Sequence, residues 1–227
     1  MAGSSLTTRA IVLRRTNYGE ADRVLSLLTP EGRLSVIARG VRREKSKLAG
    51  GIELFAVSDI VVHRGRGQLS ILTSARLVHF YRQIMADYER MTFAYRAVSL
   101  VASASETIDE PEWFDLLVEV FAGLDTASLS RRLVETWFYI RYAAILGHEL
   151  NLSIDAEGEA LVADQAYRYD SNEQSLVKRA GGNITTEHIK LLRLISTKSL
   201  TILAQVGGLD EIIGDCLAIA HQHAAVD

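Results

Sequence analysis

The chain has 227 residues, of which 48% are hydrophobic and 23% are charged, and its formal net charge is -3. This composition is typical of a packed globular protein and excludes a disordered chain. The sequence has neither a run of eighteen apolar residues nor a signal-peptide profile, so we expect a cytoplasmic protein without a membrane span. A single cysteine, Cys216, excludes an internal disulfide framework and a four-cysteine zinc site.

The charge is distributed unevenly along the chain. Residues 1–80 contain 13 Lys and Arg against 6 Asp and Glu, a net charge of +7. Residues 81–227 contain 12 against 22, a net charge of -10. The densest basic segment, from Arg39 to Lys47, holds five cations and one anion. This asymmetry is typical of a polyanion-binding module joined to a body with another task, although the basic half could also dock on the acidic half.

The first eighty residues have the periodicity of five short β-strands. Apolar and β-branched runs between turn residues predict strands at 8–15, 23–29, 33–39, 52–63 and 68–79. In the third strand, alternation places Arg33 and Arg39 on the exposed face, opposite to Val36. Five strands with their longest connection between the third and fourth match an OB-type Greek-key barrel, although an SH3-like barrel would also have five strands.

From residue 80 onward the hydrophobic period is helical. A stripe at four- and three-residue steps predicts a first helix whose core-facing residues are Ile84, Tyr88, Met91, Tyr95, Val98 and Ala102. Further helices are expected at about 113–124, 127–150, 185–197 and 210–225. The predicted fold class is therefore α+β. An OB-fold barrel (1–80) precedes a helical bundle domain (81–227), and a small β-hairpin is inserted at about 154–184.

The N-terminal half resembles the N-terminal domain of the bacterial recombination mediator family RecO. The segments that carry the resemblance are TRAIVLRR (8–15), YGEAD (18–22), LSLLT (25–29), GRLSVIARGVRR (32–43) and RGRG (64–67). The helical part follows the layout of the family with less sequence detail.

The resemblance implies a non-enzymatic mediator of DNA repair and recombination that acts after DNA damage in the RecF pathway. Such a protein binds single- and double-stranded DNA and anneals complementary strands. Its implied partners are DNA, RecR, the C-terminal tail of the single-strand binding protein SSB and, indirectly, RecA, which it helps to load on SSB-coated DNA. Its implied location is the bacterial cytoplasm, associated with the nucleoid.

Many members of this family carry a four-cysteine zinc site after the third helix, where this chain has a segment without cysteine. We therefore expect no metal and no cofactor, and we expect the inserted hairpin to replace the structural role of the zinc. No phosphate-binding loop, nucleophile elbow or carboxylate pair stands at a readable spacing, which predicts no enzymatic activity.

Basic residues around the third predicted strand are the candidate DNA-binding residues. Arginine and lysine there can meet successive phosphates without reading base sequence. A tyrosine in the first turn can stack on a base, although it could equally pack on the rim of the barrel. The predicted DNA-binding set comprises Arg33, Arg39, Arg42, Arg43, Lys45, Lys47, Arg64, Arg66 and Tyr18.

A second candidate site lies on the third predicted helix. The SSB tail that the family recognises is acidic with an apolar end, so its site should combine an apolar groove with a cation. Arg131, Arg132, Trp137 and Arg141 have this chemistry, although Trp137 would also suit a core position. Two other functions fit the sequence: a general RNA-binding OB-fold protein, and a structural adaptor that does not bind DNA directly.

Overall fold

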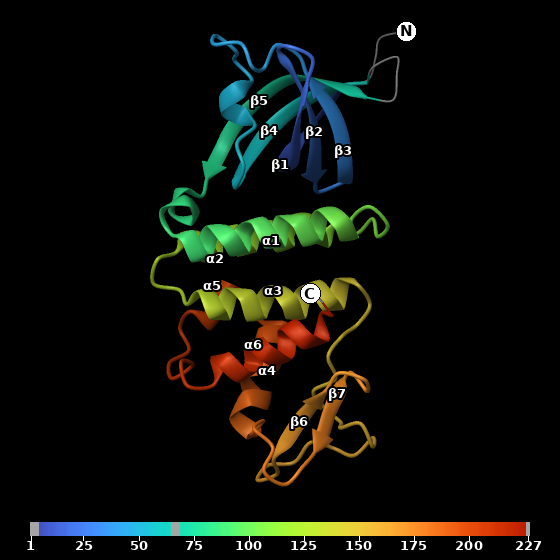
Figure 1. The fold of residues 1–227 in the computed structure, drawn as a ribbon, viewed down its shortest axis with the longest axis vertical. Helices are drawn as coiled ribbons and strands as arrows, with labels where there is room; N and C mark the ends of the chain where they lie inside the picture. The colour runs from blue at the N-terminus through green and yellow to red at the C-terminus, as the bar shows by residue number, and fades with distance from the viewer. Residues whose placement is uncertain (1–4, 65–68, 226–227) are drawn as a thin grey trace. The chain divides into compact units, whose positions relative to one another are not determined.

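A closed five-stranded barrel forms the N-terminal part of the computed structural model, which describes residues 5–64 and 69–225 (Figure 1). Its strands are β1 (Ser5–Tyr18), β2 (Asp22–Thr29), β3 (Gly32–Ala38), β4 (Ala56–His63) and β5 (Ser70–Phe80). The order around the barrel is β1-β2-β3-β5-β4, and β3 and β5 are parallel whereas the other paired strands are antiparallel. This topology is that of an OB-fold, which confirms the predicted barrel.

Aliphatic side chains fill the interior of the barrel. Leu25 and Val36 lie opposite each other on β2 and β3, and both are 0% exposed. A short 3-10 helix, Ala49–Gly51, precedes β4. The strand begins later than expected because Phe55 has a φ of 54°, which interrupts an extended backbone. Ile52 still belongs to the core of the barrel.

Two helices and a 3-10 turn follow the barrel: η2 (Arg82–Ala86), α1 (Tyr88–Ala104) and α2 (Glu112–Asp125). The core-facing stripe predicted for the first helix is wrong at Tyr88 and Tyr95, which are 74% and 48% exposed. The buried face of α1 instead carries Phe93, Ala94, Ala97, Val98, Val101 and Ala104. Within α1 the buried face is centred on Ala94, Ala97 and Val101, and at 100° per residue Tyr88 and Tyr95 point away from it, whereas η2 and the helix cap Asp87 separate Ile84 from the helix.

Contacts divide the chain into two compact units, one ending at Asp125 and the other beginning at Thr126. The first unit thus contains α1 and α2 as well as the barrel, whereas the expected domain boundary lay after residue 80. Aromatic packing explains the grouping. The ring of the buried Phe55 packs edge-on against Tyr95 of α1 at 4.8 Å and Phe121 of α2 at 5.7 Å.

The second unit contains α3 (Arg131–Ile145), α4 (Thr186–Thr197), α5 (Leu200–Leu203) and α6 (Ile213–His223), with a hairpin of β6 (Tyr167–Asp170) and β7 (Ser175–Lys178). The predicted hairpin insertion is therefore present. Its Tyr169 hydroxyl lies 2.9 Å from Nδ1 of His223, and Nε2 of this histidine lies 2.8 Å from the carbonyl oxygen of His148. None of the described helices is long and apolar enough to cross a membrane.

Candidate nucleic-acid interface

The outer face of β1, β2 and β3 carries a row of exposed and half-exposed residues. Directly opposite residues of antiparallel strands share one face of a sheet. The register aligns Arg14 with Ser26 and Ser35, and aligns Thr16 with Val24 and Ile37. These rows point outward because the intervening residues Leu25 and Val36 point into the core. We call this surface the barrel face; it comprises Arg14, Thr16, Tyr18, Val24, Ser26, Ser35 and Ile37.

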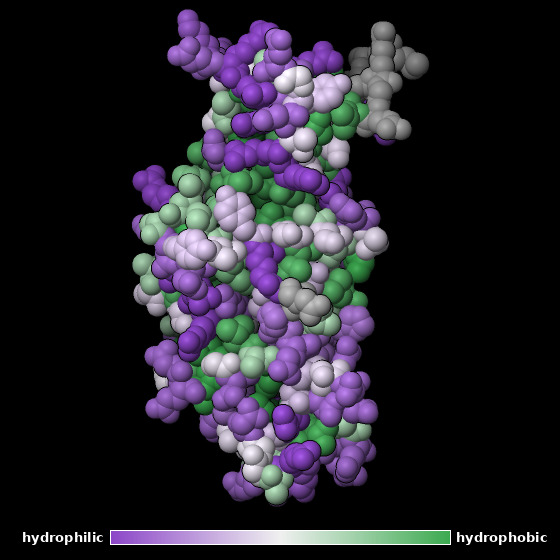
Figure 2. All heavy atoms as spheres, in the orientation of Figure 1, coloured by the Kyte–Doolittle hydropathy of each residue, from purple (hydrophilic) through white to green (hydrophobic). Residues whose placement is uncertain are grey.

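The segment Arg39–Lys47, which we call the basic loop, follows β3 directly. All five of its lysines and arginines are exposed. Within the described part of the chain, the side chains of Arg39, Arg43, Lys45 and Lys47 form no ion pair or hydrogen bond, and Arg42 donates only a long hydrogen bond of 3.3 Å to the carbonyl oxygen of Gly19. Figure 2 shows hydrophilic side chains gathered over this end of the barrel. The loop therefore presents positive charge that does not pair with any carboxylate among the residues that the structure describes.

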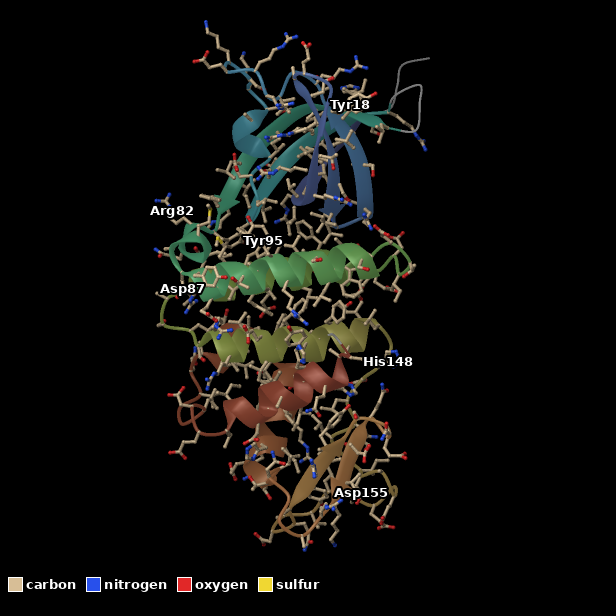
Figure 3. The ribbon with its side chains drawn as sticks, viewed as in Figure 1. Tyr18, Arg82, Asp87, Tyr95, His148 and Asp155 are labelled. Carbon is tan, nitrogen blue, oxygen red and sulfur yellow. The ribbon has the colours of Figure 1, made fainter. Side chains whose placement is uncertain are left out.

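Two backbone amides of the basic loop donate hydrogen bonds to the start of β2 and to the turn before it. The amide of Gly40 donates to Oδ1 of Asp22 at 2.7 Å, and the amide of Arg42 donates to the carbonyl oxygen of Ala21 at 2.9 Å. Gly40 has a φ of 63°, a conformation that glycine adopts at little cost. These bonds bring the loop beside Tyr18, which is 59% exposed at this end of β1 (Figure 3).

Arg33 does not belong to this exposed cluster, so the expectation of an exposed Arg33 is wrong. Its guanidinium donates to the carbonyl oxygen of Ala102 at 2.7 Å and to Oγ of Ser26 at 3.0 Å, and it lies 3.1 Å from a carboxylate oxygen of Glu106. Alternation correctly gave Arg33 an outward direction, but the C-terminal end of α1 covers that part of the face. Arg33 and Arg39 are also six residues apart, which separates them by roughly 20 Å along an extended strand.

Arg64 lies at the same end of the barrel as the basic loop. It directly follows His63, which pairs with Ile71 of β5, and Ile71 in turn pairs with Ile37 of β3. Its side chain is exposed. Arg66, the other predicted residue of this turn, lies outside the described residues.

Arg14 is an exposed member of the barrel face that the sequence did not indicate. Val12 points into the core, so simple alternation would turn Arg14 inward as well. A β-bulge between these two residues reverses the alternation. The only sequence signal for the bulge is an arginine at a position where the strand pattern demands an apolar residue.

The residues of the predicted partner site on α3 differ in their exposure and contacts. Trp137 is 4% exposed, and its indole nitrogen donates to the carbonyl oxygen of Lys198 at 2.8 Å. The guanidinium of Arg141 lies 5.5 Å from the centre of the Trp137 ring, and Arg131 pairs with Glu135 within the helix. Arg132 is exposed. Trp137 therefore acts as a core residue, and an incoming peptide could not use it as an anchor.

Residues with metal-binding side chains are scattered rather than grouped. Among the described residues, no cluster of three or more His, Cys, Asp or Glu could hold a metal ion. Burial, reinforced by the charge of Asp215, raises the pKa of the Cys216 thiol to about 12, so this buried cysteine is a poor ligand at neutral pH.

Known protein families match both the N-terminal and the C-terminal part of the chain. The family Recombination protein O N terminal matches residues 1–81, and Recombination protein O C terminal matches residues 85–222. The DNA repair protein RecO of Dehalococcoides mccartyi is 28% identical over 216 residues, which cover 92% of this chain and 85% of the relative. The DNA repair protein RecO of Roseiflexus is 37% identical over 122 residues, which cover 53% of this chain and 43% of that relative. The RecO protein of Synechococcus elongatus is 38% identical over 143 residues, which cover 60% of this chain and 53% of that relative. The chain belongs to the RecO family.

Proposed function

We propose that this protein acts in DNA repair by binding single- and double-stranded DNA along the basic loop and the barrel face, and by annealing complementary strands. The observation that carries the proposal is the group of five exposed cations in the basic loop, none of which pairs with a carboxylate in the described chain and which lie beside the exposed Tyr18. The name DNA repair protein RecO, which the similar proteins bear, supports the same role.

Phosphates are the expected ligands of the basic loop. Each cation that meets a phosphate releases condensed counterions, so the affinity falls as salt rises. If about five phosphates are neutralised, the slope of log affinity against log salt is roughly -3.5 for single strands and -4.5 for duplex DNA. On the barrel face, Arg14 can meet a further phosphate, and Tyr18 offers an aromatic surface on which a base can stack.

Annealing follows from the same charges without a chemical step. Neutralising the phosphates of two strands lowers the repulsion that slows their encounter. The proposal includes the partners of the family: RecR, the SSB tail and, indirectly, RecA. Because Trp137 is buried, Arg132 of α3, which is exposed, is the candidate contact for the SSB tail that we retain from the predicted site.

A charge-reversal experiment tests the DNA-binding site. The double variant Arg42→Glu/Arg43→Glu should bind single-stranded DNA much more weakly, and the magnitude of its salt slope should fall by about 1.4, since two phosphate contacts are lost. The matched control is Arg76→Glu/Arg82→Glu, which makes the same change of charge on β5 and η2 of the same unit and should retain the slope. Circular dichroism verifies that both variants are folded.

Three results would contradict the proposal. A salt slope near zero for the wild type would mean that phosphate contacts do not drive binding. Equal losses in both double variants would mean that only net charge matters. A clear preference for RNA over DNA oligonucleotides, without acceleration of annealing, would favour a general RNA-binding protein.

A further inference from the structure

A polar groove in the second unit lies along the outer edge of β6, between the hairpin and α6. Its main cavity has a volume of about 370 Å³, and an adjoining cavity measures about 280 Å³. Arg168, Tyr169, Arg179 and Gln222 line both cavities, so the two form one continuous groove. The proposed DNA contacts of the barrel do not involve this groove.

Two arginines of the hairpin lie close together on one side of this groove. Arg168 is opposite Val177, and the amide of Arg179 donates to the carbonyl oxygen of Ala166 at 3.0 Å. This register makes Arg168 and Arg179 diagonal neighbours on one face of the hairpin, with Cα atoms about 7 to 8 Å apart. Both side chains are exposed, and neither has a hydrogen-bond or ion-pair partner in the described part of the chain. Such a pair of like charges favours an anion between or beside the two guanidinium groups.

The two carboxylates that border the groove, Asp170 and Asp215, contact other protein groups and not the two arginines. Oδ1 of Asp215 accepts a hydrogen bond of 2.7 Å from the Asn183 side chain, and its other oxygen lies 3.5 Å from Nε2 of His188. Oδ1 of Asp170 accepts from the amide of Asn172 at 2.9 Å. In the described part of the chain neither carboxylate pairs with Arg168 or Arg179, so the two arginines remain available to a ligand.

The backbone of β6 adds a donor to the same groove. Tyr167 exchanges two backbone hydrogen bonds with Ile184 across the outer edge of the strand, at 2.8 and 3.0 Å. Because edges alternate along a strand, the amide of Tyr169 points to this outer edge as well. The groove thus has two guanidinium groups and a backbone N–H along one wall.

We infer that this groove binds the phosphodiester backbone of a single nucleic-acid strand, as a second strand-binding site separate from the barrel. The inference rests on the proposed annealing function, which requires that two strands be held at once. An acidic peptide is the other polyanion to consider. The groove favours the nucleic acid because the two isoleucines that line it, Ile184 and Ile219, are 1% and 3% exposed, and its exposed apolar side chains, Ala180 and Ala218, are too small to hold an apolar anchor.

The test uses the full chain carrying Arg42→Glu/Arg43→Glu, in which the barrel site is weakened. A labelled oligothymidylate should still bind this variant at low salt, through the three remaining cations of the basic loop and through the groove. Adding Arg168→Glu/Arg179→Glu should weaken this residual binding further and lower the magnitude of its salt slope by about 1.4, since two more phosphate contacts are lost. Adding Lys190→Glu/Lys198→Glu, which makes the same change of charge elsewhere in the second unit, should leave it unchanged.

Annealing of complementary oligonucleotides provides the second readout. In an otherwise wild-type chain, Arg168→Glu/Arg179→Glu should slow annealing by about tenfold or more while the affinity for a first strand changes less than about threefold, since the barrel still holds that strand. Folding is verified by circular dichroism and by the thermal midpoint.

Several outcomes would overturn the inference. One is that no residual binding exists in the barrel variant, and another is that the two added double variants lose it equally. A third is that the groove arginines are needed for binding a glutamate-rich peptide but not for binding the oligonucleotide. Failure of the proposed function gives a different result: the wild type itself would neither bind nor anneal DNA.

Discussion

Arg33 and Arg43 have the same side chain and lie ten positions apart, yet their surroundings give them different roles. Arg33 donates to the carbonyl oxygen of Ala102 at the end of α1, where a cation offsets the negative end of the helix. Arg43 has no side-chain partner in the described chain and faces solvent. The sequence predicts the chemistry of both residues, but only the neighbouring elements decide which one is available to DNA.

A buried histidine couples the stability of the second unit to pH. Burial lowers the pKa of His223 from its ordinary value of 6.5, although its hydrogen bond to the carbonyl of His148 opposes this shift. Between the lowered pKa and 6.5, the unfolded chain binds more protons than the folded chain, so the free energy of unfolding decreases as pH falls through this range.

The prediction is that the thermal midpoint of the wild type falls between about pH 7 and pH 5, and that His223→Gln reduces this dependence. At neutral pH, His223→Gln should lower the free energy of unfolding by about 1 to 3 kcal/mol, since the Tyr169 hydroxyl and the His148 carbonyl lose a well-placed partner. His63→Gln, at an exposed position on β4, is the control and should retain the pH dependence. An unchanged pH profile in His223→Gln would contradict this account.

At the scale of the elements, irregularities determine which residues reach the binding surface. The β-bulge in β1 turns Arg14 outward, and the short 3-10 helix before β4 brings Gly51 against β5. Neither feature follows from the strand period, because a bulge adds one residue at a position that pairing with the neighbouring strand selects. The sequence therefore predicted the correct number of strands. The ends of the strands and the residues on each face could be assigned only from the pairing register with the neighbouring strands.

Gly51 provides a test of this close packing. A Cβ atom at Gly51 would overlap the carbonyl group of Ala75 on β5, whereas a Cβ atom at Gly50 would meet nothing within 4 Å. Gly51→Ala should therefore destabilise the protein by about 1 to 3 kcal/mol through overpacking. Gly50→Ala should be close to neutral, and chemical denaturation measures both. Equal stabilities of the two variants would contradict the packing argument.

Asp22 tests whether the shape of the basic loop matters in addition to its charge. Asp22→Ala removes a negative charge, which by itself would raise DNA affinity, but it also removes the acceptor for the amide of Gly40. We expect a severalfold loss of affinity, because the loop loses its fixed position. Asp22→Asn keeps an acceptor oxygen without the charge and should equal or exceed the wild type in a fluorescence titration. A gain of affinity in Asp22→Ala would show that charge alone, and not the shape of the basic loop, determines the affinity for DNA.

At the scale of the whole molecule, the barrel is inseparable from the helices that follow it. Ile11, Leu28 and Phe55 are each at most 2% exposed but lie outside the interior core cluster of the barrel. The contacts of α1 with β1 and of α2 with β2 indicate what covers this outer layer. The first unit therefore extends to Asp125, although the family description of the N-terminal domain ends at residue 81.

A fragment of residues 1–125 should accordingly unfold in one cooperative thermal transition and retain the salt-dependent binding of single-stranded DNA. A fragment of residues 1–80 should expose the apolar outer layer and therefore bind a hydrophobic dye. It should also be less stable, because each Å² of apolar surface that α1 and α2 no longer bury removes about 25 cal/mol of stabilisation. Cooperative unfolding of the shorter fragment at the same midpoint would show that α1 and α2 do not contribute.

The sequence by itself determined the five strands, the helical second half, the inserted hairpin and the basic loop, because local periodicity and charge are properties of neighbouring residues. It also pointed to the RecO family through the motifs of the first half. Only the tertiary structure decided that α1 covers Arg33, that the bulge exposes Arg14, that Trp137 is buried, and that Arg168 and Arg179 line one groove. These outcomes depend on strand register and on contacts between residues far apart in the chain, which the local pattern does not contain.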